Sequence, residues 1–417
     1  MNIELADIEK AAERISGIAI KTPVLTARVF SQVFDADILL KCENLQKTGA
    51  FKIRGAANAI GKMVENNDRS PVIASSAGNH AQGVAYAATK YGIKSTIVMP
   101  ENAPLAKVEA TCGYGAEVVQ YGNCYDECYK KACDICAETG AKFLHPYDNA
   151  DVIAGQGTIG LEILEQVPDV DVILVPAGGG GLLSGVAAAV KQKRPEVKVI
   201  GVQAEGADAV AQSFHAKKRI CSEKAVTIAD GIAVKNPGEL TVDLICRYVD
   251  DVVTVSENNI YAAVVFLAER SKLIVEPAGA VSVAAILGKN VDVKGKHVVC
   301  VLSGGNIDIS SIHQILQKGL VVRHRWAEFR IVHSPSSCSL HDVLSCITES
   351  GANLLSMRHD LLAVNLQPGE QVINAFCEVR NKAHIEELAD TLQSRGCRVE
   401  VNVNTLPSLL NGVFGQY

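Results

Sequence analysis

One lysine has neighbours unlike those of an ordinary surface lysine. Lys52 follows Phe51 and opens a helical pattern inside the stretch Thr48–Ala56, with a glycine on either side. Lysines normally keep their ammonium group in water, but an apolar environment disfavours the charge and leaves a neutral amine. Such an amine is a nucleophile and forms Schiff bases with carbonyl compounds. Lys52 is therefore the first candidate catalytic residue, although a solvated lysine at a helix start would also fit this stretch.

Two loops of small residues each follow a predicted strand and precede a predicted helix. The first, Ser75–His80, reads Ser-Ser-Ala-Gly-Asn-His, and the second, Gly178–Gly181, is a run of four glycines. Backbone N–H groups and the helix dipole attract anions at such helix starts. We expect a substrate carboxylate at the first loop, where Asn79 could also bond a cofactor oxygen, and a phosphate at the second. Either loop alone would also fit a plain turn.

The glycine run does not match the two common nucleotide-binding motifs. A P-loop requires a lysine after its last glycine, whereas Val186 follows Gly185. A dinucleotide fingerprint that starts at Gly178 requires glycine or alanine where Leu183 stands. The run therefore favours a phosphate monoester over ATP or NAD.

Two further segments bring polar side chains to the ends of apolar runs. Ser303, in the stretch Leu302–Asn306, follows a predicted strand at the edge where open parallel sheets bind ligands. Its hydroxyl would offer a neutral donor or acceptor to a ligand ring. Glu276 directly precedes Pro277 at the start of a predicted helix. We expect Glu276 to be a helix-start carboxylate rather than a catalytic residue.

Short apolar runs alternate with helical patterns between Pro71 and Asn306. Because strands buried on both faces read as continuous Val- and Ile-rich runs, these runs predict strands of a parallel sheet. They lie at residues 72–75, 95–99, 116–121, 171–176, 197–203 and 297–302. Alternating strands and helices predict an α/β fold with a doubly wound, mainly parallel sheet.

The composition changes after Gly319, and the segment Leu320–Glu328 holds the only tryptophan. Beyond it the pattern predicts strand, helix, strand, strand, helix and strand, an order typical of a ferredoxin-like module. The strands are expected at 329–333, 353–359, 371–379 and 398–403, and the helices at 340–350 and 383–394. Residues 404–417 carry no readable signal, and we expect a tail.

Composition bounds the class of protein. A chain of 417 residues, 48% hydrophobic and 21% charged, predicts two or three globular domains. The net charge of -6 and the lack of a basic cluster argue against nucleic acid or anionic membranes as partners. No apolar run is long enough to span a bilayer, and the N-terminus has no signal-peptide pattern. We therefore expect a cytoplasmic protein.

The thirteen cysteines are an odd, scattered set, which suggests reduced thiols. Four of them, Cys124, Cys128, Cys133 and Cys136, lie close together in sequence. Helical spacing places Cys133 nearly opposite Cys124, so the four cannot converge on one ion. We expect packed thiols rather than a metal site.

The five segments occur in the order and approximate spacing of the fold-type-II pyridoxal-phosphate enzymes. Within them the chain most closely resembles the threonine dehydratases with a single ACT domain, over roughly residues 4–325 and including Lys41–Gln46. The resemblance implies a two-lobed fold like that of the tryptophan synthase β-subunit, followed by a βαββαβ ACT domain. The implied parts are a catalytic domain at 1–322 with its smaller lobe at about 54–146, a linker at 323–328 and the ACT domain at 329–403.

The resemblance also assigns roles to residues. Lys52 would hold pyridoxal phosphate as a Schiff base, and Phe51 would pack against the cofactor ring. Asn79 would bond the ring hydroxyl, and Ser303 would face the pyridine nitrogen. The phosphate would be held by Gly178, Gly179, Gly180, Gly181 and Leu182. The substrate carboxylate would be bound by Ser76, Ala77, Gly78, Asn79 and His80.

The reaction implied is loss of water from L-threonine to give 2-oxobutanoate and ammonia, and from L-serine to give pyruvate. Lys52 would remove the α-proton as general base. A serine facing the pyridine nitrogen, in place of a carboxylate, favours rapid elimination over transamination. A serine racemase or serine dehydratase on the same scaffold is the alternative. Racemases carry a second serine where Ala77 stands, and Ala77 has no exchangeable proton, which favours one-base elimination.

Cation and effector sites are less well defined. The divalent-cation carboxylates of the racemases align with Gln203 and Ala209, so no essential metal is expected.

The ACT-like region would bind an amino-acid effector such as isoleucine or valine, or would serve only to pair subunits in a homodimer or homotetramer. The usual Pro-Gly turn is replaced there by the stretch Ser334–Leu340, which makes close approach of a ligand harder. Isoleucine biosynthesis and threonine catabolism both stay open, and an NAD-linked dehydrogenase or a non-enzymatic sensor would share the coarse architecture.

Overall fold

The computed structural model describes residues 3–361, 363–364 and 366–402. The tail expected at 404–417 lies outside these residues. The chain divides into two compact units, residues 1–308 and 309–417. Helix α13 (Ile309–Val322), which the sequence analysis placed at the end of the catalytic domain, groups with the second unit.

The larger sheet of the first unit has six strands in the order β1-β2-β10-β7-β8-β9. All neighbouring pairs are parallel except β1 with β2. The strands are β1 (Val24–Thr26), β2 (Asp37–Cys42), β7 (Val172–Pro176), β8 (Lys198–Ala204), β9 (Asp251–Val255) and β10 (His297–Leu302). Central strands such as β7 are buried along their whole length, because helices cover both faces of the sheet.

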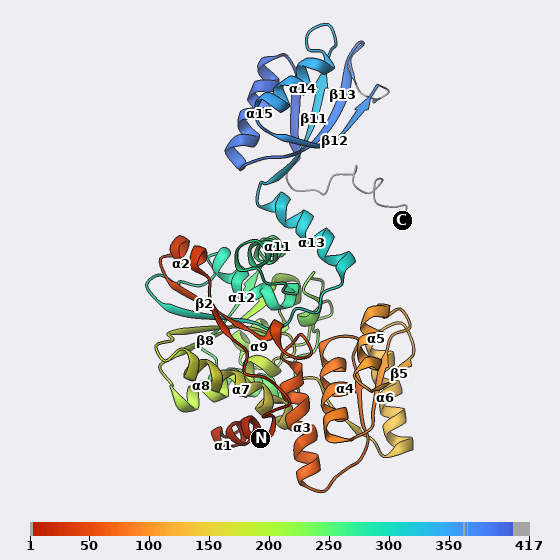
Figure 1. Ribbon diagram of the computed structural model, residues 1–417, viewed down its shortest axis with the longest axis vertical. Coiled ribbons are helices and arrows are strands. Elements are labelled where there is room, and N and C mark those ends of the chain that lie inside the picture. The colour runs from red at the N-terminus through yellow and green to blue at the C-terminus, as the bar shows by residue number, and fades with distance from the viewer. Residues whose placement is uncertain (1–2, 362, 365, 403–417) are drawn as a thin grey trace. The chain divides into compact units, whose positions relative to one another are not determined.

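The smaller sheet of the first unit is fully parallel and has the order β5-β4-β3-β6. Its strands are β3 (Val72–Ser75), β4 (Ser95–Met99), β5 (Glu117–Gln120) and β6 (Lys142–Phe143). Helices α4, α5 and α6 lie around it in the orange and yellow part of Figure 1. The sheet lies within the predicted smaller lobe at 54–146.

Twelve α-helices of the described first unit surround the two sheets. They are α1 (Leu5–Arg14), α2 (Arg28–Phe34), α3 (Lys52–Glu65), α4 (Asn79–Tyr91), α5 (Leu105–Gly113), α6 (Tyr125–Thr139), α7 (Ala150–Gln166), α8 (Gly181–Lys193), α9 (Ala209–Ala216), α10 (Glu239–Tyr248), α11 (Glu257–Phe266) and α12 (Pro277–Leu287). Figure 1 shows α7 and α8 on one side of the larger sheet and α11 and α12 on the other. The doubly wound prediction is confirmed. None of the helices in the described residues is long and apolar enough to cross a bilayer.

The second unit carries an antiparallel sheet of order β12-β13-β11-β14. After α13 its elements are β11 (Trp326–His333), α14 (Leu340–Glu349), β12 (Asn353–Asp360), β13 (Gln371–Glu378), α15 (Lys382–Ser394) and β14 (Arg398–Asn402). The predicted βαββαβ order is confirmed. The expected linker at 323–328 is too long, because β11 already begins at Trp326. Trp326 pairs with Glu378 of β13, and the next residue, Ala327, is fully buried.

Candidate active site

The lysine segment is attached to the end of strand β10. The N–H of Phe51 donates to the carbonyl oxygen of Ser303 over 3.0 Å, and the N–H of Gly305 donates to the carbonyl of Gly49 over 2.8 Å. Helix α3 begins at Lys52, directly after this contact. Two of the predicted segments, far apart in sequence, therefore meet at the carboxyl edge of the larger sheet, where such sheets bind ligands.

Lys52 lies in surroundings that suit a neutral amine. Its Nζ donates to the carbonyl oxygen of Pro146 over 2.8 Å and lies 5.2 Å from the centre of the Phe51 ring. Burial lowers the pKa of Lys52 to about 8, and only an ionised Glu276 would oppose this shift. A larger fraction of this lysine is therefore uncharged near neutral pH than of a lysine in water.

Asn79, the first residue of α4, is held between two side chains. Its Nδ2 donates to Oε1 of Glu276 over 2.8 Å, and its Oδ1 accepts from Nδ2 of Asn306 over 2.8 Å. Nδ2 of Asn306 also donates to the carbonyl oxygen of Thr48 over 2.7 Å. Because a carbonyl can only accept, Thr48 fixes which end of the Asn306 amide is nitrogen, and Asn306 in turn fixes Asn79. The second N–H of Asn79 Nδ2 is then a donor of fixed direction.

Glu276 is buried in this network, with 5% of its surface exposed. Burial raises its pKa to about 8, with a further upward contribution from the charge of Asp230, so the carboxyl group holds a proton at neutral pH. Glu276 stands directly before α12, as the sequence analysis expected, but its side chain makes no capping hydrogen bond. The sequence signal for a buried Glu276 was its position inside an apolar stretch. In the structure both neighbours, Val275 and Pro277, are buried.

The glycine run forms a tight turn between β7 and α8. Gly180 has a φ of +98°, a conformation that favours glycine. A Cβ at Gly179 would overlap the ring of Tyr147, and one at Gly181 would lie 2.9 Å from the Tyr147 Cβ. Only glycine fits these positions, and α8 starts here with its N–H groups unpaired within the helix. This cradle at a helix N-terminus fits a phosphate group.

The sequence analysis missed a loop that links the lysine to the glycine run. Pro146 accepts the bond from Lys52, and Tyr147, the next residue, packs against the glycines. Nδ1 of His145 accepts from the N–H of Asp148 over 2.8 Å. Burial lowers the pKa of His145 to about 4, so this ring is neutral at physiological pH. No motif marks this loop, because its role depends on contacts with distant residues.

The other residues predicted to bind substrate or cofactor lie near the starts of α4 and α8. Oγ of Ser76 accepts from the N–H of Gly78 over 3.2 Å, at the half-buried turn before α4. His80 is buried, and its Nε2 contacts the carbonyl oxygen of Leu144 over 2.8 Å. Burial, together with the charge of Lys52, lowers the pKa of His80 to about 3. Leu182 packs into the hydrophobic core, so only its backbone can face a ligand.

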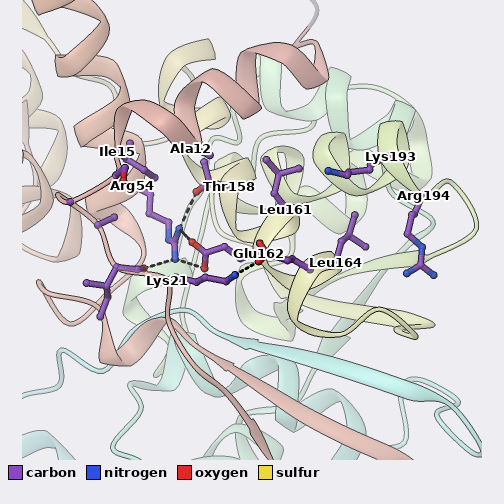
Figure 2. A pocket seen from close by; sticks show the side chains of 15 residues that line it. Ala12, Ile15, Lys21, Arg54, Thr158, Leu161, Glu162, Leu164, Lys193 and Arg194 are labelled. Carbon is purple, nitrogen blue, oxygen red and sulfur yellow. Dashed lines mark hydrogen bonds and ion pairs between the residues drawn. The ribbon is translucent and has the colours of Figure 1, made fainter.

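A cavity of about 1140 Å³ lies apart from these residues. Figure 2 shows Arg54 on its wall, bonded to Thr158 and Glu162. Arg54 also donates to both carboxylate oxygens of Glu43, each over 2.8 Å. None of the residues predicted to bind cofactor or substrate lines this cavity. Arg54 belongs to α3, the helix that begins at Lys52, so its ion pairs hold that helix in place.

Among the described residues, no group of three or more His, Cys, Asp or Glu side chains could hold a metal ion. Cys124 lies just before α6, and Cys128 is buried within that helix. Gln203, at one position aligned with the racemase cation site, uses its Oε1 to accept from the N–H of Ala211 over 2.8 Å.

The family model for pyridoxal-phosphate dependent enzymes matches residues 15–304. The chain belongs to this family. Its cofactor is pyridoxal phosphate, which agrees with the lysine of lowered pKa and the phosphate-sized glycine cradle. The expected fold-type-II architecture is confirmed as well.

Individual relatives are similar over most of the chain. The L-threonine ammonia-lyase of Thermotoga maritima is 47% identical over 401 residues, which cover 96% of this chain and 99% of that protein. Threonine deaminase isoform 2 from Solanum lycopersicum matches with a TM-score of 0.71 and 34% identity, over 75% of this chain and 92% of that one. Maize serine racemase matches with a TM-score of 0.72 and 37% identity, over 77% and 98%.

Proposed function

We propose that the protein is a threonine ammonia-lyase, which removes water from L-threonine to yield 2-oxobutanoate and ammonia and also converts L-serine to pyruvate. The observation that carries this proposal is that one segment at the end of β10 bonds both partners: Ser303 accepts from the residue before Lys52, and Asn306 donates to Asn79. The 47% identity to an L-threonine ammonia-lyase along nearly the whole chain supports the choice of substrate.

The chain's own residues have distinct tasks in this proposal. Lys52 binds the cofactor and then, as a free amine, takes the α-proton of the substrate. Its lowered pKa of about 8 gives a larger fraction of the neutral, proton-accepting form than an ordinary lysine has. The cofactor, when bound, supplies an electron sink for the bond that breaks. The N–H groups of Gly178–Gly181 and Leu182 would hold its phosphate, and Phe51 would pack against its ring.

Two polar side chains would contact the cofactor ring. The second N–H of Asn79 would donate to the ring hydroxyl, and Ser303 would offer the pyridine nitrogen a neutral hydroxyl in place of a carboxylate. A neutral hydroxyl would not stabilise a positive charge on that nitrogen, which favours elimination over transamination. The Ser76–His80 loop binds the substrate carboxylate at the start of α4.

One residue favours elimination over the racemase alternative. Ala77 stands at the turn before α4 and has no group that could return a proton to the substrate. A racemase needs a proton donor on the face opposite the lysine. Similarity to maize serine racemase therefore supports the scaffold, while Ala77 supports a lyase.

The test is a product assay on the purified protein. We expect 2-oxobutanoate from L-threonine, and loss of this product in Lys52→Ala. The matched control is Lys62→Ala, which removes an exposed lysine on the same helix that forms an ion pair with Asp151. D-serine formed from L-serine without any 2-oxo acid would replace this proposal by the racemase.

We further propose that the enzyme is cytoplasmic, assembles as a homodimer or homotetramer, and carries an ACT domain that binds isoleucine or valine. Effector binding would indicate a role in isoleucine biosynthesis rather than threonine catabolism. The loop before α14 ends in a capping box between Ser339 and Asp342, and Asn353 at the start of β12 faces Glu378 over 3.4 Å. Titration calorimetry with both amino acids tests this, and no heat with either would leave the domain a pairing role.

A further inference from the structure

Two cysteines of the C-terminal unit lie in direct contact. Cys338 ends the loop between β11 and α14, and Cys397 directly precedes β14. Their sulfur atoms are 3.3 Å apart, and both residues are buried, with exposed fractions of 1% and 5%. A disulfide bond has an S–S length of about 2.05 Å, so the two sulfurs need to approach by only roughly 1.3 Å.

Residues beside each cysteine are exposed although the cysteines themselves are buried. Ser337, before Cys338, is exposed, and so are Gly396 and Arg398 on either side of Cys397. Opening of the loop before α14 would therefore expose both sulfurs without unfolding the sheet. In the closed form burial raises the pKa of Cys397 to about 12, so the thiolate that reacts with oxidants forms in the open state.

We propose that Cys338 and Cys397 are a modification site, at which a small-molecule disulfide such as glutathione disulfide reversibly installs an intramolecular disulfide bond. The thiolate of one cysteine attacks the small disulfide, forms a mixed disulfide and releases one small thiol. The thiolate of the other attacks the protein sulfur of that mixed disulfide and releases the second small thiol. The two protein thiols lose two protons and two electrons, and these reduce the oxidant to two thiols.

The bond closes a loop that contains α14, β12, β13 and α15, which is most of the C-terminal unit. It ties the segment before α14 to β14, an edge strand that pairs with β11. A cross-link that closes a loop from Cys338 to Cys397 restricts the unfolded chain. The oxidised C-terminal unit should therefore open less often than the reduced one. Such a bond is transient in a reducing compartment, consistent with the thirteen cysteines being thiols at rest.

The test is peptide mapping of the full-length protein. The reduced protein is incubated with glutathione disulfide, its remaining thiols are alkylated, and the digest is searched for a peptide pair joined through Cys338 and Cys397. We expect this pair in the wild type, its loss after dithiothreitol, and its absence in Cys338→Ser and Cys397→Ser. Cys346→Ser, which alters a third buried cysteine of the same core, should keep the bond.

Hydrogen exchange of the wild type provides a readout that needs no variant. The oxidised protein should show slower exchange in α14 and β14 than the reduced protein, with unchanged exchange in the residue 1–308 unit. Full alkylation of both cysteines after oxidant treatment would overturn the proposal. A bond from either cysteine to Cys346 instead would also overturn it.

Discussion

Nδ2 of Asn79 donates to Oε1 of Glu276 over 2.8 Å, although 197 positions separate the two residues. The acceptor is a buried carboxyl group whose pKa is raised to about 8. At neutral pH it is a neutral group that accepts through its carbonyl oxygen. Asn79 is thus held from one side by a protonated acid and from the other by Asn306, which leaves one N–H of its amide for the cofactor.

Replacing Glu276 by glutamine should preserve activity at neutral pH. Gln offers the same carbonyl acceptor as a protonated Glu, so we expect kcat/KM within about threefold of wild type at pH 7. Glu276→Ala removes the acceptor and should lower it by roughly tenfold or more, as expected for a lost hydrogen bond of about 1.5 kcal/mol. An activity of Glu276→Gln as low as that of Glu276→Ala would show that the ionised form is needed.

The same residue predicts a pH dependence of stability. Burial raises the pKa of Glu276 from 4.5 to about 8, so between these values the folded state binds a proton that the unfolded state has lost. Stability then falls as pH rises through this window, by at most about 4 kcal/mol for this group. Denaturant unfolding of the apo-protein should show a steeper loss from pH 5 to pH 8 in wild type than in Glu276→Gln. Parallel profiles would contradict the raised pKa.

Asn306→Asp should disturb the cofactor without disturbing the fold. A carboxylate there would face the carbonyl of Thr48 and Oδ1 of Asn79, which both accept hydrogen bonds. We expect the Asn79 amide to turn over, and the affinity of the apo-protein for pyridoxal phosphate to fall by about tenfold or more. Asn290→Asp is the matched control, because exposed Asn290 also donates to a backbone carbonyl, that of Thr254. Equal affinities in both variants would contradict the assigned amide orientation.

Gly179→Ala should weaken phosphate binding. The added Cβ overlaps the ring of Tyr147, and shifting that ring moves the glycine run, at a cost of about 1–3 kcal/mol for overpacking. Cofactor titration of the apo-protein should show a raised Kd together with a lower Tm. Gly113→Ala, where a Cβ meets nothing within 4 Å, should leave both unchanged. An unchanged Kd in Gly179→Ala would argue against the cradle.

Arg54→Met should strongly destabilise the catalytic unit. Burial by itself would raise the pKa of Glu43, but the charge and hydrogen bonds of Arg54 more than offset this and hold it below 4.5. This pairing stabilises the fold above pH 4.5, and its contribution is lost as pH falls. We expect a loss of about 3–5 kcal/mol at pH 7 and a smaller loss at pH 4, measured by denaturant unfolding. The double variant with Glu43→Gln should recover part of the loss, and failure to recover any would exclude an unpaired charge as the cause.

Local sequence predicted those elements whose pattern is determined by burial on both faces. Strands at Ser95–Met99 and His297–Leu302 were predicted with the observed bounds, because continuous Val and Ile runs require a covered sheet. Strand β9 (Asp251–Val255) was missed, since its burial is interrupted along the strand. The two-residue strand β6 is too short to give a pattern.

The residues of the candidate site also divide into those with a local sequence pattern and those without one. Lys52, Asn79 and the glycine run carry local signals, because a helix start or a tight turn restricts which residues fit. The roles of Glu276, Asn306 and Pro146 cannot be predicted locally, because each depends on hydrogen bonds to residues distant in sequence. Only the fold brings such partners together.

We propose above all that Lys52 holds the cofactor and that the enzyme deaminates L-threonine. The most direct measurement is peptide mapping of the holo-protein after borohydride reduction, which makes the link to the lysine permanent. We expect a pyridoxyl group on Lys52 and, in the same preparation before reduction, release of 2-oxobutanoate from L-threonine. A pyridoxyl group on another lysine, or none at all, would contradict it.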